Sequence, residues 1–434
     1  MSTVILNADQ QRALDEIVGA FTPGERHLLT GYAGSGKTTL MQHVARAFTR
    51  QRKTVVLTAP THKAVAVLRA KIKQAGLDGV DCRTLHSLLS LKPKPHGDRQ
   101  KFERDRRAEP VMADVVVIDE CSMVSADLMA HIKRHLPLSF TLFVGDPAQL
   151  PPVGEVASQT FDTQSRSHLD TIVRQGAGNP VLDAAHAIRS SQGGPMDWTW
   201  AKSSNVPPYG VFMPREADAW MQKGFTSPDF DADPDTFRYL AWTNARVAEV
   251  NSRVRCWRYG DSIPTPFMPG ERAMFRGPVV QDGSIAFSTN EEATVQEIAR
   301  STFCFDVPHC MGCDGWTAEV PSWEVSMLRA DGTEKTVHMA SDDRAYNKVI
   351  AQITDEAGDC RARWGHLQSF KSAMAKLQSI YAMTVHTSQG STFRNAFVDL
   401  PDIRRRADSN ILETQQMLYV AATRPTHALV LVGA

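Results

Sequence analysis

The chain has 434 residues. Because this is longer than a domain with a single hydrophobic core usually is, about two to four domains are predicted. Hydrophobic residues make up 42% and charged residues 22%, as is typical of globular proteins, and no apolar run reaches the ~18–20 residues of a membrane span, so no membrane partner is expected. The 48 basic and 48 acidic residues cancel, so nucleic acid can be bound only through local basic surfaces. Seven scattered cysteines and an N-terminus without a signal-peptide pattern predict a cytoplasmic protein.

The first part of the chain alternates between predicted helices and strands. The apolar patterns predict helices at 8–20, 38–48 and 63–74, and strands at 27–30, 54–59, 115–118 and 141–144. Such alternation is typical of a parallel sheet with helices on its faces. Residues 92–110, with seven lysines and arginines and three prolines, interrupt this pattern and are predicted to leave the sheet as an excursion.

The second part predicts another α/β unit that carries an insertion. Residues 190–235 are rich in Gly, Pro, Ser and Asp and are expected to form a connection with little regular structure. Residues 262–345 alternate short apolar runs with Gly and Pro, which predicts a small all-β insertion. The second unit itself is expected to comprise strands at 237–242, 379–384, 396–400 and 428–432 and helices at 245–255 and 365–380.

A glycine-rich loop follows the first predicted strand and opens a helix, which is the context of a P-loop. It reads Gly31-Tyr-Ala-Gly-Ser-Gly-Lys-Thr-Thr39. Glycines let backbone N–H groups converge on phosphates, and the helix N-terminus adds partial positive charge. Lys37 is expected to reach the β- and γ-phosphates, and the Thr38 hydroxyl to ligate Mg²⁺. The other nucleotide-binding residues predicted in this loop are Gly34, Ser35, Gly36 and Thr39.

Two carboxylates end a later buried strand, Val-Val-Val-Ile-Asp-Glu. Asp119 is expected to hold Mg²⁺, directly or through water, and Glu120 to orient and deprotonate the attacking water. Together with the P-loop, this pair predicts a magnesium-dependent nucleoside triphosphatase. Negative charge that develops on the γ-phosphate is stabilised by arginine fingers, and Arg174 and Arg424 are candidates for that role. Taken alone, either arginine could equally be a solvated surface residue.

Further segments follow the two nucleotide motifs in a fixed order. They are Ala59-Pro-Thr-His-Lys-Ala64, Thr84-Leu-His86, Gly145-Asp-Pro-Ala-Gln-Leu-Pro-Pro-Val-Gly154 and Thr384-Val-His-Thr-Ser-Gln-Gly-Ser-Thr392. In this order and spacing the chain resembles superfamily 1 helicases of the 5′→3′ branch, which includes RecD-like enzymes and phage Dda-type helicases. The resemblance covers nearly the whole chain and is loose over 190–235 and the β insertion.

The resemblance implies an α/β fold with two RecA-like P-loop domains. The first would span 1–180, with an inserted wedge hairpin at about 90–111. The second would comprise 181–261 and 365–434, interrupted by a small β-barrel-like insertion at 262–364.

The resemblance also implies residue roles at an ATP and Mg²⁺ site. Gln10 matches the glutamine that reads adenine, and Gln149 the residue that links the state of the γ-phosphate to domain movement. Arg174 and Arg424 match the arginines that reach the γ-phosphate from the domain interface, and Gly390 a glycine close to the phosphates. One departure from the family pattern is Pro425, where relatives more often carry a small residue.

Four loops match segments that touch single-stranded DNA in the family. Short hydroxyl and imidazole groups suit phosphate contacts that must be made and released repeatedly. The predicted contacts are Pro60, Thr61 and His62 in the first loop, Thr84 and His86 in the second, Thr243 and Asn244 in the third, and Thr384, His386 and Ser388 in the fourth. Thr387 stands where many relatives have Lys, which removes one basic contact.

Two features outside the nucleotide motifs have competing interpretations. Phe102, the aromatic residue of the basic excursion, is expected either to stack on a base pair at a fork or to belong to a solvated charged loop. Cys310-Met-Gly-Cys313, with Cys304 and His309 nearby, suggests a zinc site. Zinc is disfavoured because no second cysteine pair exists and Cys360 stands alone in the sequence.

The motifs and the resemblance together predict an ATP-dependent DNA helicase that moves on single-stranded DNA and unwinds duplex DNA. The 5′→3′ direction is implied by the resemblance alone. Its expected partners are single-stranded and fork DNA and replication or recombination proteins such as a single-strand-binding protein. It is expected to act as a monomer in a bacterial or phage-infected cell. The alternatives are a translocase or nuclease-complex motor that displaces proteins with little unwinding, and an NTP-gated nucleic-acid clamp. RNA as substrate, and a role in replication, recombination or repair, stay open.

Overall fold

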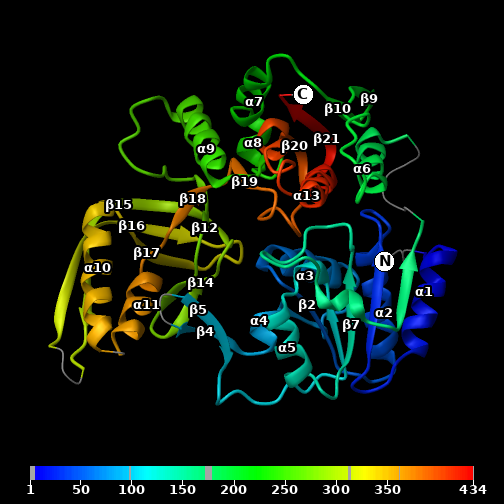
Figure 1. Cartoon of the computed structure of the whole chain (residues 1–434), viewed down its shortest axis with the longest axis horizontal. Coiled ribbons are helices and arrows are strands. Elements are labelled where there is room, and N and C mark those ends of the chain that lie inside the picture. Colours follow the sequence, from blue (N-terminus) through cyan, green and yellow to red (C-terminus); the bar gives the residue numbers. More distant parts are fainter. Residues whose placement is uncertain (1–4, 97–98, 172–177, 311–313, 361, 434) are drawn as a thin grey trace. The chain divides into compact units, whose positions relative to one another are not determined.

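The computed structural model describes residues 5–96, 99–171, 178–310, 314–360 and 362–433 (Figure 1). The chain divides into two compact units. Unit 1 comprises Met1–Ser90, Arg106–Val254 and Tyr381–Ala434, and unit 2 comprises Leu91–Asp105 and Arg255–Ile380. Unit 1 contains two largely parallel sheets, and unit 2 is built on an antiparallel sheet.

The first sheet of unit 1 is parallel, with the strand order β3-β2-β6-β7-β1-β8. Every residue of its central strands β6 and β7 is buried, as expected for strands covered on both faces. Its strands are β1 (Arg26–Gly31), β2 (Val55–Ala59), β3 (Asp81–Thr84), β6 (Val115–Ile118), β7 (Phe140–Gly145) and β8 (Arg166–Leu169). Its helices are α1 (Ala8–Gly19), α2 (Lys37–Arg50), α3 (His62–Gln74), α4 (Leu85–Leu88) and α5 (Ala126–His135), with 3₁₀ turns η1 (Cys121–Met123) and η2 (Gln159–Asp162).

Helix α2 shows how the apolar pattern builds this part of the core. Leu40, Val44 and Phe48 recur every four residues, so they share one face of the helix and are fully buried against the sheet. Burial of each such side chain stabilises the fold by about 1.5–3 kcal/mol. The helix thereby fixes the glycine-rich loop that precedes it.

The second sheet of unit 1 has the order β19-β11-β20-β21-β10-β9 and is parallel except for the β9–β10 pair. Its strands are β9 (Ser204–Val206), β10 (Tyr209–Phe212), β11 (Phe237–Ala241), β19 (Ala382–Thr384), β20 (Phe393–Asp399) and β21 (Pro425–Val432). Its helices are α6 (Pro180–Ser190), α7 (Ala217–Phe225), α8 (Pro228–Ala232), α9 (Asn244–Tyr259), α12 (Leu400–Arg404) and α13 (Ile411–Thr423). The two parallel sheets confirm the predicted α/β fold class.

The prediction of an irregular connection at 190–235 is wrong. This segment contains β9, β10, α7 and α8. Its small and polar residues serve as helix boundaries: Ser227 accepts a hydrogen bond from the Phe230 N–H, and Pro228 occupies the first turn of α8. Phe225 is fully buried, with its ring edge-on to Phe230 and Tyr381. The turn residues suggested a linker, whereas these aromatic contacts make the segment part of the core.

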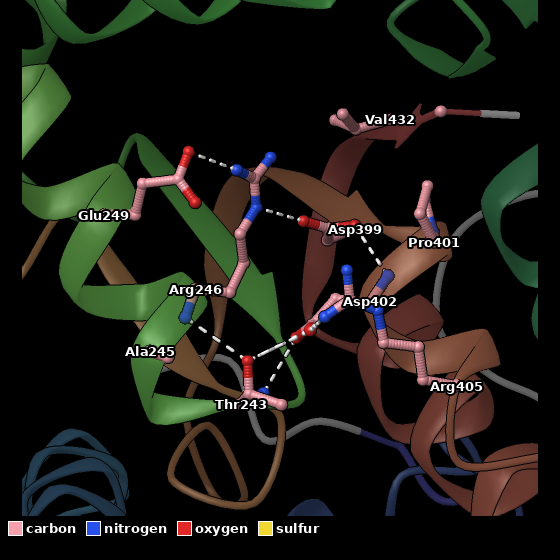
Figure 2. Close-up of a pocket in the computed structure, with 10 residues that line it drawn as sticks. Thr243, Ala245, Arg246, Glu249, Asp399, Pro401, Asp402, Arg405 and Val432 are labelled. Carbon is pink, nitrogen blue, oxygen red and sulfur yellow. Dashed lines mark hydrogen bonds and ion pairs between the residues drawn. The ribbon is translucent and has the colours of Figure 1, made fainter.

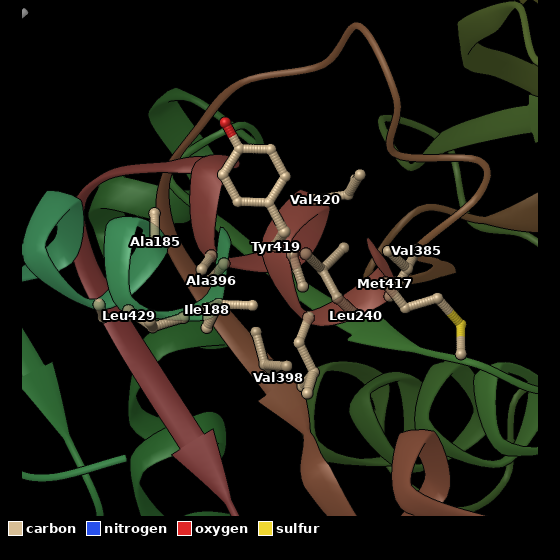
Figure 3. Close-up of a cluster of buried hydrophobic side chains, with 14 of the residues drawn as sticks. Ala185, Ile188, Leu240, Val385, Ala396, Val398, Met417, Tyr419, Val420 and Leu429 are labelled. Atoms are coloured by element: carbon tan, nitrogen blue, oxygen red, sulfur yellow. The ribbon is translucent and has the colours of Figure 1, made fainter. Parts of the chain in front are cut away.

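Helix α13 is buried on all sides rather than along one stripe, since every residue from Thr414 to Ala422 is buried. Its Met417 and Val420 belong to a cluster with Leu240 of β11 and Val398 of β20 (Figure 3). A helix packed on every face can move only together with its surroundings.

Unit 2 contains a five-stranded antiparallel sheet in the order β17-β16-β15-β12-β18. Its strands are β12 (Arg272–Phe275), β15 (Glu292–Val307), β16 (Trp316–Leu328), β17 (Glu334–Ala340) and β18 (Leu377–Ser379), with a ribbon of β13 (Val279–Gln281) and β14 (Ser284–Phe287). Helices α10 (Asp343–Asp359) and α11 (Arg363–Ala373) complete it. The predicted β insertion is thus an antiparallel sheet, accompanied by a helix, α10, that was not predicted.

The helix predicted at 365–380 is wrong at its C-terminal end. Helix α11 ends at Ala373, and Leu377–Ser379 forms β18, which pairs with β12. Likewise, the strand predicted at 379–384 is divided between β18 and β19. Local hydrophobicity did not reveal these breaks, because both strands depend on partners about 100 or more residues away in the sequence.

The basic excursion is an antiparallel hairpin of β4 (Leu91–His96) and β5 (Arg99–Arg104). Prolines are tolerated because a two-stranded ribbon leaves one edge of each strand without a ladder partner. Phe102 lies opposite Pro93 in the register, and its side chain is 44% exposed. Strand β4 contacts helix α11, so the hairpin belongs to the same compact unit as the insertion.

Within the described residues, no helix combines the length and the apolar content that crossing a bilayer requires.

A buried histidine on β1 makes the stability of unit 1 depend on pH. His27 is 3% exposed, with its ring nitrogens 2.7 Å from Ser165 Oγ and 2.9 Å from Ser167 Oγ. Burial lowers the pKa of His27, and the charge of Glu16 opposes this effect only in part. The unfolded chain therefore binds the proton more readily, so the stabilisation is present above the usual histidine pKa of about 6.5 and is lost as the pH falls below it.

We expect the free energy of unfolding of the native protein to decrease between pH 7.5 and pH 5.5 more steeply than that of a His27→Asn variant, whose amide does not titrate. Urea denaturation at several pH values measures both slopes. His309→Asn, at an exposed histidine, is the matched control and should keep the native slope. Equal slopes for native protein and His27→Asn would contradict the prediction.

Candidate nucleotide site

The glycine-rich loop connects β1 to α2 in a conformation that only glycine adopts easily. Gly34 and Gly36 have φ of +84° and +83°, and Gly36 is the N-cap of α2. A Cβ at Gly31 would lie 2.7 Å from Ser35 Oγ and 3.0 Å from Leu169 Cβ. The loop is therefore pinned closely to the sheet, and the N-terminus of the 14-residue helix α2 opens directly from it.

Two side chains in this loop are arranged to receive phosphate oxygens. Lys37 Nζ donates to the carbonyl oxygens of Gly31 at 2.7 Å and Tyr32 at 2.9 Å, so its ammonium is held over the loop. Ser35 is fully buried, and its hydroxyl has no hydrogen-bond partner among the described residues. A buried hydroxyl normally finds a partner, and a phosphate oxygen in the loop would supply one.

Asp119 and Glu120 follow β6 in a tight turn. The Asp119 N–H donates to the Thr58 carbonyl at 2.8 Å, and the Glu120 N–H donates to Asp119 Oδ1 at 2.9 Å. Glu120 has φ of +50°, a left-handed conformation that is strained for a residue other than glycine. Burial raises the pKa of Asp119 to about 7, with a further contribution from the negative charge of Glu120. A cation beside Asp119 would reverse this effect and keep the carboxylate ionised.

Two residues have side chains that fit Mg²⁺. Thr38, in the first turn of α2, and Asp119, after β6, offer the hydroxyl and carboxylate oxygens that Mg²⁺ prefers. Mg²⁺ at nucleotide sites takes only one or two protein ligands, with water and phosphate completing its shell.

Gln10 has a structural role that was not predicted: it caps helix α1 and contacts the glycine-rich loop. Its side chain accepts a hydrogen bond from the Asn7 N–H at 3.2 Å and donates to the Ser35 carbonyl at 3.2 Å. Asn7 Oδ1 in turn accepts from the Gln10 N–H at 2.8 Å, which completes a capping box at the start of α1. The Asn-x-x-Gln spacing was the sequence signal for this cap.

The loop at 388–391 lies against the carboxylate turn, although about 270 residues separate them in the sequence. Gly390 has φ of +71°, and a Cβ there would lie 3.4 Å from Thr61 Oγ1 and 3.9 Å from Glu120 Cγ. Arg424, 6% exposed, donates to the carbonyl oxygens of Ser388 at 3.4 Å and Ser391 at 3.1 Å. The structure therefore brings Glu120, Gly390 and Arg424 into one region of unit 1.

The segment after β7 also contacts this region. Gln389 Nε2 donates to the Leu150 carbonyl at 3.1 Å. Gln149 is 6% exposed, and its Oε1 has no hydrogen-bond partner among the residues that the structure describes. Arg174, the second predicted arginine finger, lies outside the described residues.

The threonines predicted to contact DNA cap local structure. Thr61 Oγ1 accepts from the Ala64 N–H at 3.2 Å, and Thr84 Oγ1 accepts from the Ser87 N–H at 3.2 Å, so they begin α3 and α4. Thr384 Oγ1 accepts from the Thr387 N–H at 3.2 Å. These hydroxyls stabilise the local turns, and their contact with DNA stays a prediction.

The remaining predicted DNA contacts differ in exposure. Ser388 is fully buried, and its hydroxyl donates to the Val385 carbonyl at 2.7 Å, so it stabilises its own loop. Burial lowers the pKa of His86, and the positive charges of His131 and His62 lower it further. Burial also lowers the pKa of His386, against the raising effect of Glu413. Pro60 is half-buried and Asn244 is exposed.

Thr243 lines a cavity of about 450 Å³ that lies apart from the nucleotide residues (Figure 2). Its N–H and Oγ1 donate to the buried Asp402 at 2.8 Å and 3.0 Å. In the same cavity Arg246 donates to Asp399 at 2.7 Å and to Glu249 at 2.7 Å. These hydrogen bonds join the N-terminal end of α9 to α12 at the cavity.

Cys360, which stands alone in the sequence, has a neighbouring cysteine in the structure. Its Sγ lies 2.8 Å from Cys310 Sγ in unit 2. The buried Arg363 donates to the carbonyl oxygens of Pro308, at 2.8 Å, and Asp314, and so holds both ends of the loop that carries Cys310. Cys313 lies outside the described residues, and the described ones form no group of three or more metal-ligating side chains.

Comparisons with known proteins match both halves of this arrangement. Residues 5–204 match the family described as AAA domain, and residues 379–432 match the UvrD-like helicase C-terminal domain. The ATP-dependent DNA helicase Dda of Enterobacteria phage T4 is 26% identical, over 96% of this chain and 97% of its own. The RecBCD enzyme subunit RecD of Mycolicibacterium smegmatis is 24% identical, over 94% of this chain and 68% of its own.

The fold agrees with a solved structure of the same kind. Bacteroides Pif1 bound to ssDNA superimposes with a TM-score of 0.52 at 18% identity, over 99% of this chain and 92% of that one. Over nearly its full length the chain is related to the superfamily 1 helicases Dda and RecD. The family predicted from the motifs is therefore confirmed. The AAA-domain match covers the glycine-rich loop and the Asp119–Glu120 turn, so it supports a nucleotide site at these residues.

Proposed function

We propose that this chain is an ATP-dependent DNA helicase that translocates 5′→3′ on single-stranded DNA and unwinds duplex DNA. The observation that carries the proposal is the proximity of Gly390 to Glu120, in a loop whose Ser391 carbonyl accepts a hydrogen bond from Arg424. This contact connects the P-loop sheet with the second parallel sheet at the point where the γ-phosphate would lie. The similarity to Dda, whose name states ATP-dependent DNA helicase activity, supports the same function.

In the proposed ATP hydrolysis, different residues bind the phosphates, activate water and stabilise the developing charge. The loop amides and Lys37 hold the phosphates, while Glu120 orients the attacking water and accepts its proton. Arg424 stabilises the charge that develops on the γ-phosphate once its guanidinium leaves the carbonyls of Ser388 and Ser391. Mg²⁺, held by Thr38 and Asp119, would supply further charge neutralisation when bound.

Movement along DNA follows from changes in the contacts between the two sheets. Residues 1–180 form one proposed domain, and 181–261 with 365–434 form the other. Gln389 donates a hydrogen bond to the Leu150 carbonyl, and Gln149 precedes Leu150 in the chain. Both glutamines would respond to the γ-phosphate. The loops around His62, His86 and His386 would then hold and release the DNA backbone in alternation.

Unit 2 supplies the proposed strand-separating element. The hairpin β4–β5 carries a basic sequence and the exposed Phe102, and it contacts α11 within the same unit. We assign it as the wedge, supported by the barrel-like insertion at 262–364. A single-strand-binding protein is a fitting partner because it would capture the displaced strand. The protein is proposed to act as a monomer.

A strand-displacement assay with duplexes that carry only a 5′ or only a 3′ tail tests this function. We expect ATP-dependent unwinding of the 5′-tailed duplex and none of the 3′-tailed one. An RNA-tailed duplex tests the choice of nucleic acid. Translocation without strand separation would indicate the motor alternative, and a single round of release per ATP would indicate the clamp. Either result would contradict the proposed helicase function.

A further inference from the structure

Helix α13 contains a tyrosine whose ring and hydroxyl face different surroundings. The ring of Tyr419 belongs to the buried cluster that contains Ala185, Ile188 and Leu429. Figure 3 shows its hydroxyl pointing away from the aliphatic side chains. Tyr419 is 2% exposed, so this hydroxyl is directed at other parts of the protein rather than at solvent.

The hydroxyl joins three segments that are far apart in the sequence. It donates to Asp146 Oδ2 at 2.7 Å and accepts a hydrogen bond from the Ala33 N–H at 3.2 Å. Arg189 Nη1 of helix α6 lies 3.4 Å from the same oxygen. Ala33 belongs to the glycine-rich loop, and Asp146 follows β7 three residues before Gln149.

Asp146 is a fully buried carboxylate that pairs with both Tyr419 and Arg189. Its Oδ1 accepts from the Ala148 N–H at 3.1 Å and forms an ion pair with Arg189. The Arg189 guanidinium also lies 4.4 Å from the centre of the Tyr32 ring, beside the nucleotide loop. A buried carboxylate is strongly destabilising unless it is paired, so any displacement of Tyr419 or Arg189 is resisted.

Tyr419 keeps its proton in this position. Burial raises the pKa of its hydroxyl, and the negative charge of Asp146 raises it further. The group therefore remains a donor toward Asp146 and an acceptor toward the loop amide. In that state it is hydrogen-bonded to the nucleotide loop and to the segment after β7 at the same time.

We infer that Tyr419 is a positioning residue that couples the nucleotide loop and the Gln149 segment to the arginine finger. The inference rests on the proposed function. Arg424 follows Tyr419 by five residues at the end of the same helix, about 7.5 Å along its axis. Because α13 is packed on all sides, a shift at the Tyr419 hydroxyl moves Arg424 with it. Tyr419 itself contributes no group to the phosphates.

A Tyr419→Phe variant tests the inference, because it keeps the ring and removes only the hydroxyl. We expect kcat for ATP hydrolysis with single-stranded DNA to fall about ten-fold, the size of one lost hydrogen bond to a charged group, with KM for ATP little changed. Asp146→Asn, which weakens the link from the other side, should give a similar fall. It also provides a second measurement if Tyr419→Phe fails to fold in a thermal melt.

Measuring Tyr419→Phe in an Arg424→Lys protein distinguishes coupling of Tyr419 to Arg424 from a purely structural role of Tyr419. If Tyr419 acts through Arg424, adding Tyr419→Phe to Arg424→Lys should not lower kcat further. The matched control is Tyr346→Phe, at a buried tyrosine whose hydroxyl has no hydrogen-bond partner in the described part of unit 2. It should leave kcat unchanged.

An unchanged kcat in Tyr419→Phe, or losses that multiply in the double variant, would overturn the inference. Failure of the proposed function is distinguished by the native protein alone. If native protein hydrolyses ATP without stimulation by DNA, the helicase proposal fails. In that case the comparison of native and Tyr419→Phe kcat still tests the coupling.

Discussion

Replacing Lys37 by alanine is expected to reduce DNA-stimulated ATP hydrolysis by at least about 100-fold, the cost of removing one preorganised charged donor from a transition state. In the structure, its ammonium is held by the Gly31 and Tyr32 carbonyls within the loop that would cradle the phosphates. No other lysine lies in this loop. A coupled-enzyme ATPase assay with excess single-stranded DNA measures the effect.

Lys73→Ala is the control for this variant, because Lys73 is an exposed residue near the end of α3. It should retain the native rate. Thermal unfolding should be similar for both variants and the native protein. A Lys37→Ala protein that still hydrolyses ATP at the native rate would show that the active site lies elsewhere.

Replacing Arg424 by alanine is expected to reduce DNA-stimulated hydrolysis by about 1,000-fold, the lower range for an arginine finger. The structure adds a second consequence. Arg424 donates to the carbonyls of Val420, Ser388 and Ser391, so its removal also loosens the loop that carries Gly390. We therefore expect a lower melting temperature together with the lower rate.

Arg424→Lys separates the two effects, since lysine keeps the charge but cannot form the same fork of hydrogen bonds. Binding of a fluorescent ATP analogue should persist in both variants, because the P-loop is intact. An Arg424→Ala protein with a lowered melting temperature and a native rate would assign Arg424 a purely structural role. Single-turnover hydrolysis at saturating ATP measures the chemical step directly.

Sequence by itself determined the features that depend on short-range order. The Gly31–Thr39 loop, the buried run before Asp119 and the alternation of strands and helices each occupy a few consecutive residues. Backbone geometry and apolar spacing determine them locally. The ordered motifs were then enough to identify the family, because their spacing reflects one arrangement of the chain.

Some local signals were present but were interpreted wrongly. The Gly, Pro, Ser and Asp residues at 190–235 suggested a linker, although Ser227 and Pro228 begin a helix. Thr61 and Thr84 show a related ambiguity: their contact with DNA stays a prediction, and their hydroxyls also cap α3 and α4. Polar residues of these types favour turns, caps and ligand contacts alike, so composition cannot separate the three.

Only the tertiary structure decided which distant residues meet. Gly390 lies beside Glu120, Tyr419 bonds to Asp146, and the Cys360 and Cys310 sulfurs are 2.8 Å apart. These contacts join positions 50 to more than 270 residues apart. They depend on how helices and sheets pack, and a sequence pattern fixes which face of an element is buried but not which partner covers it.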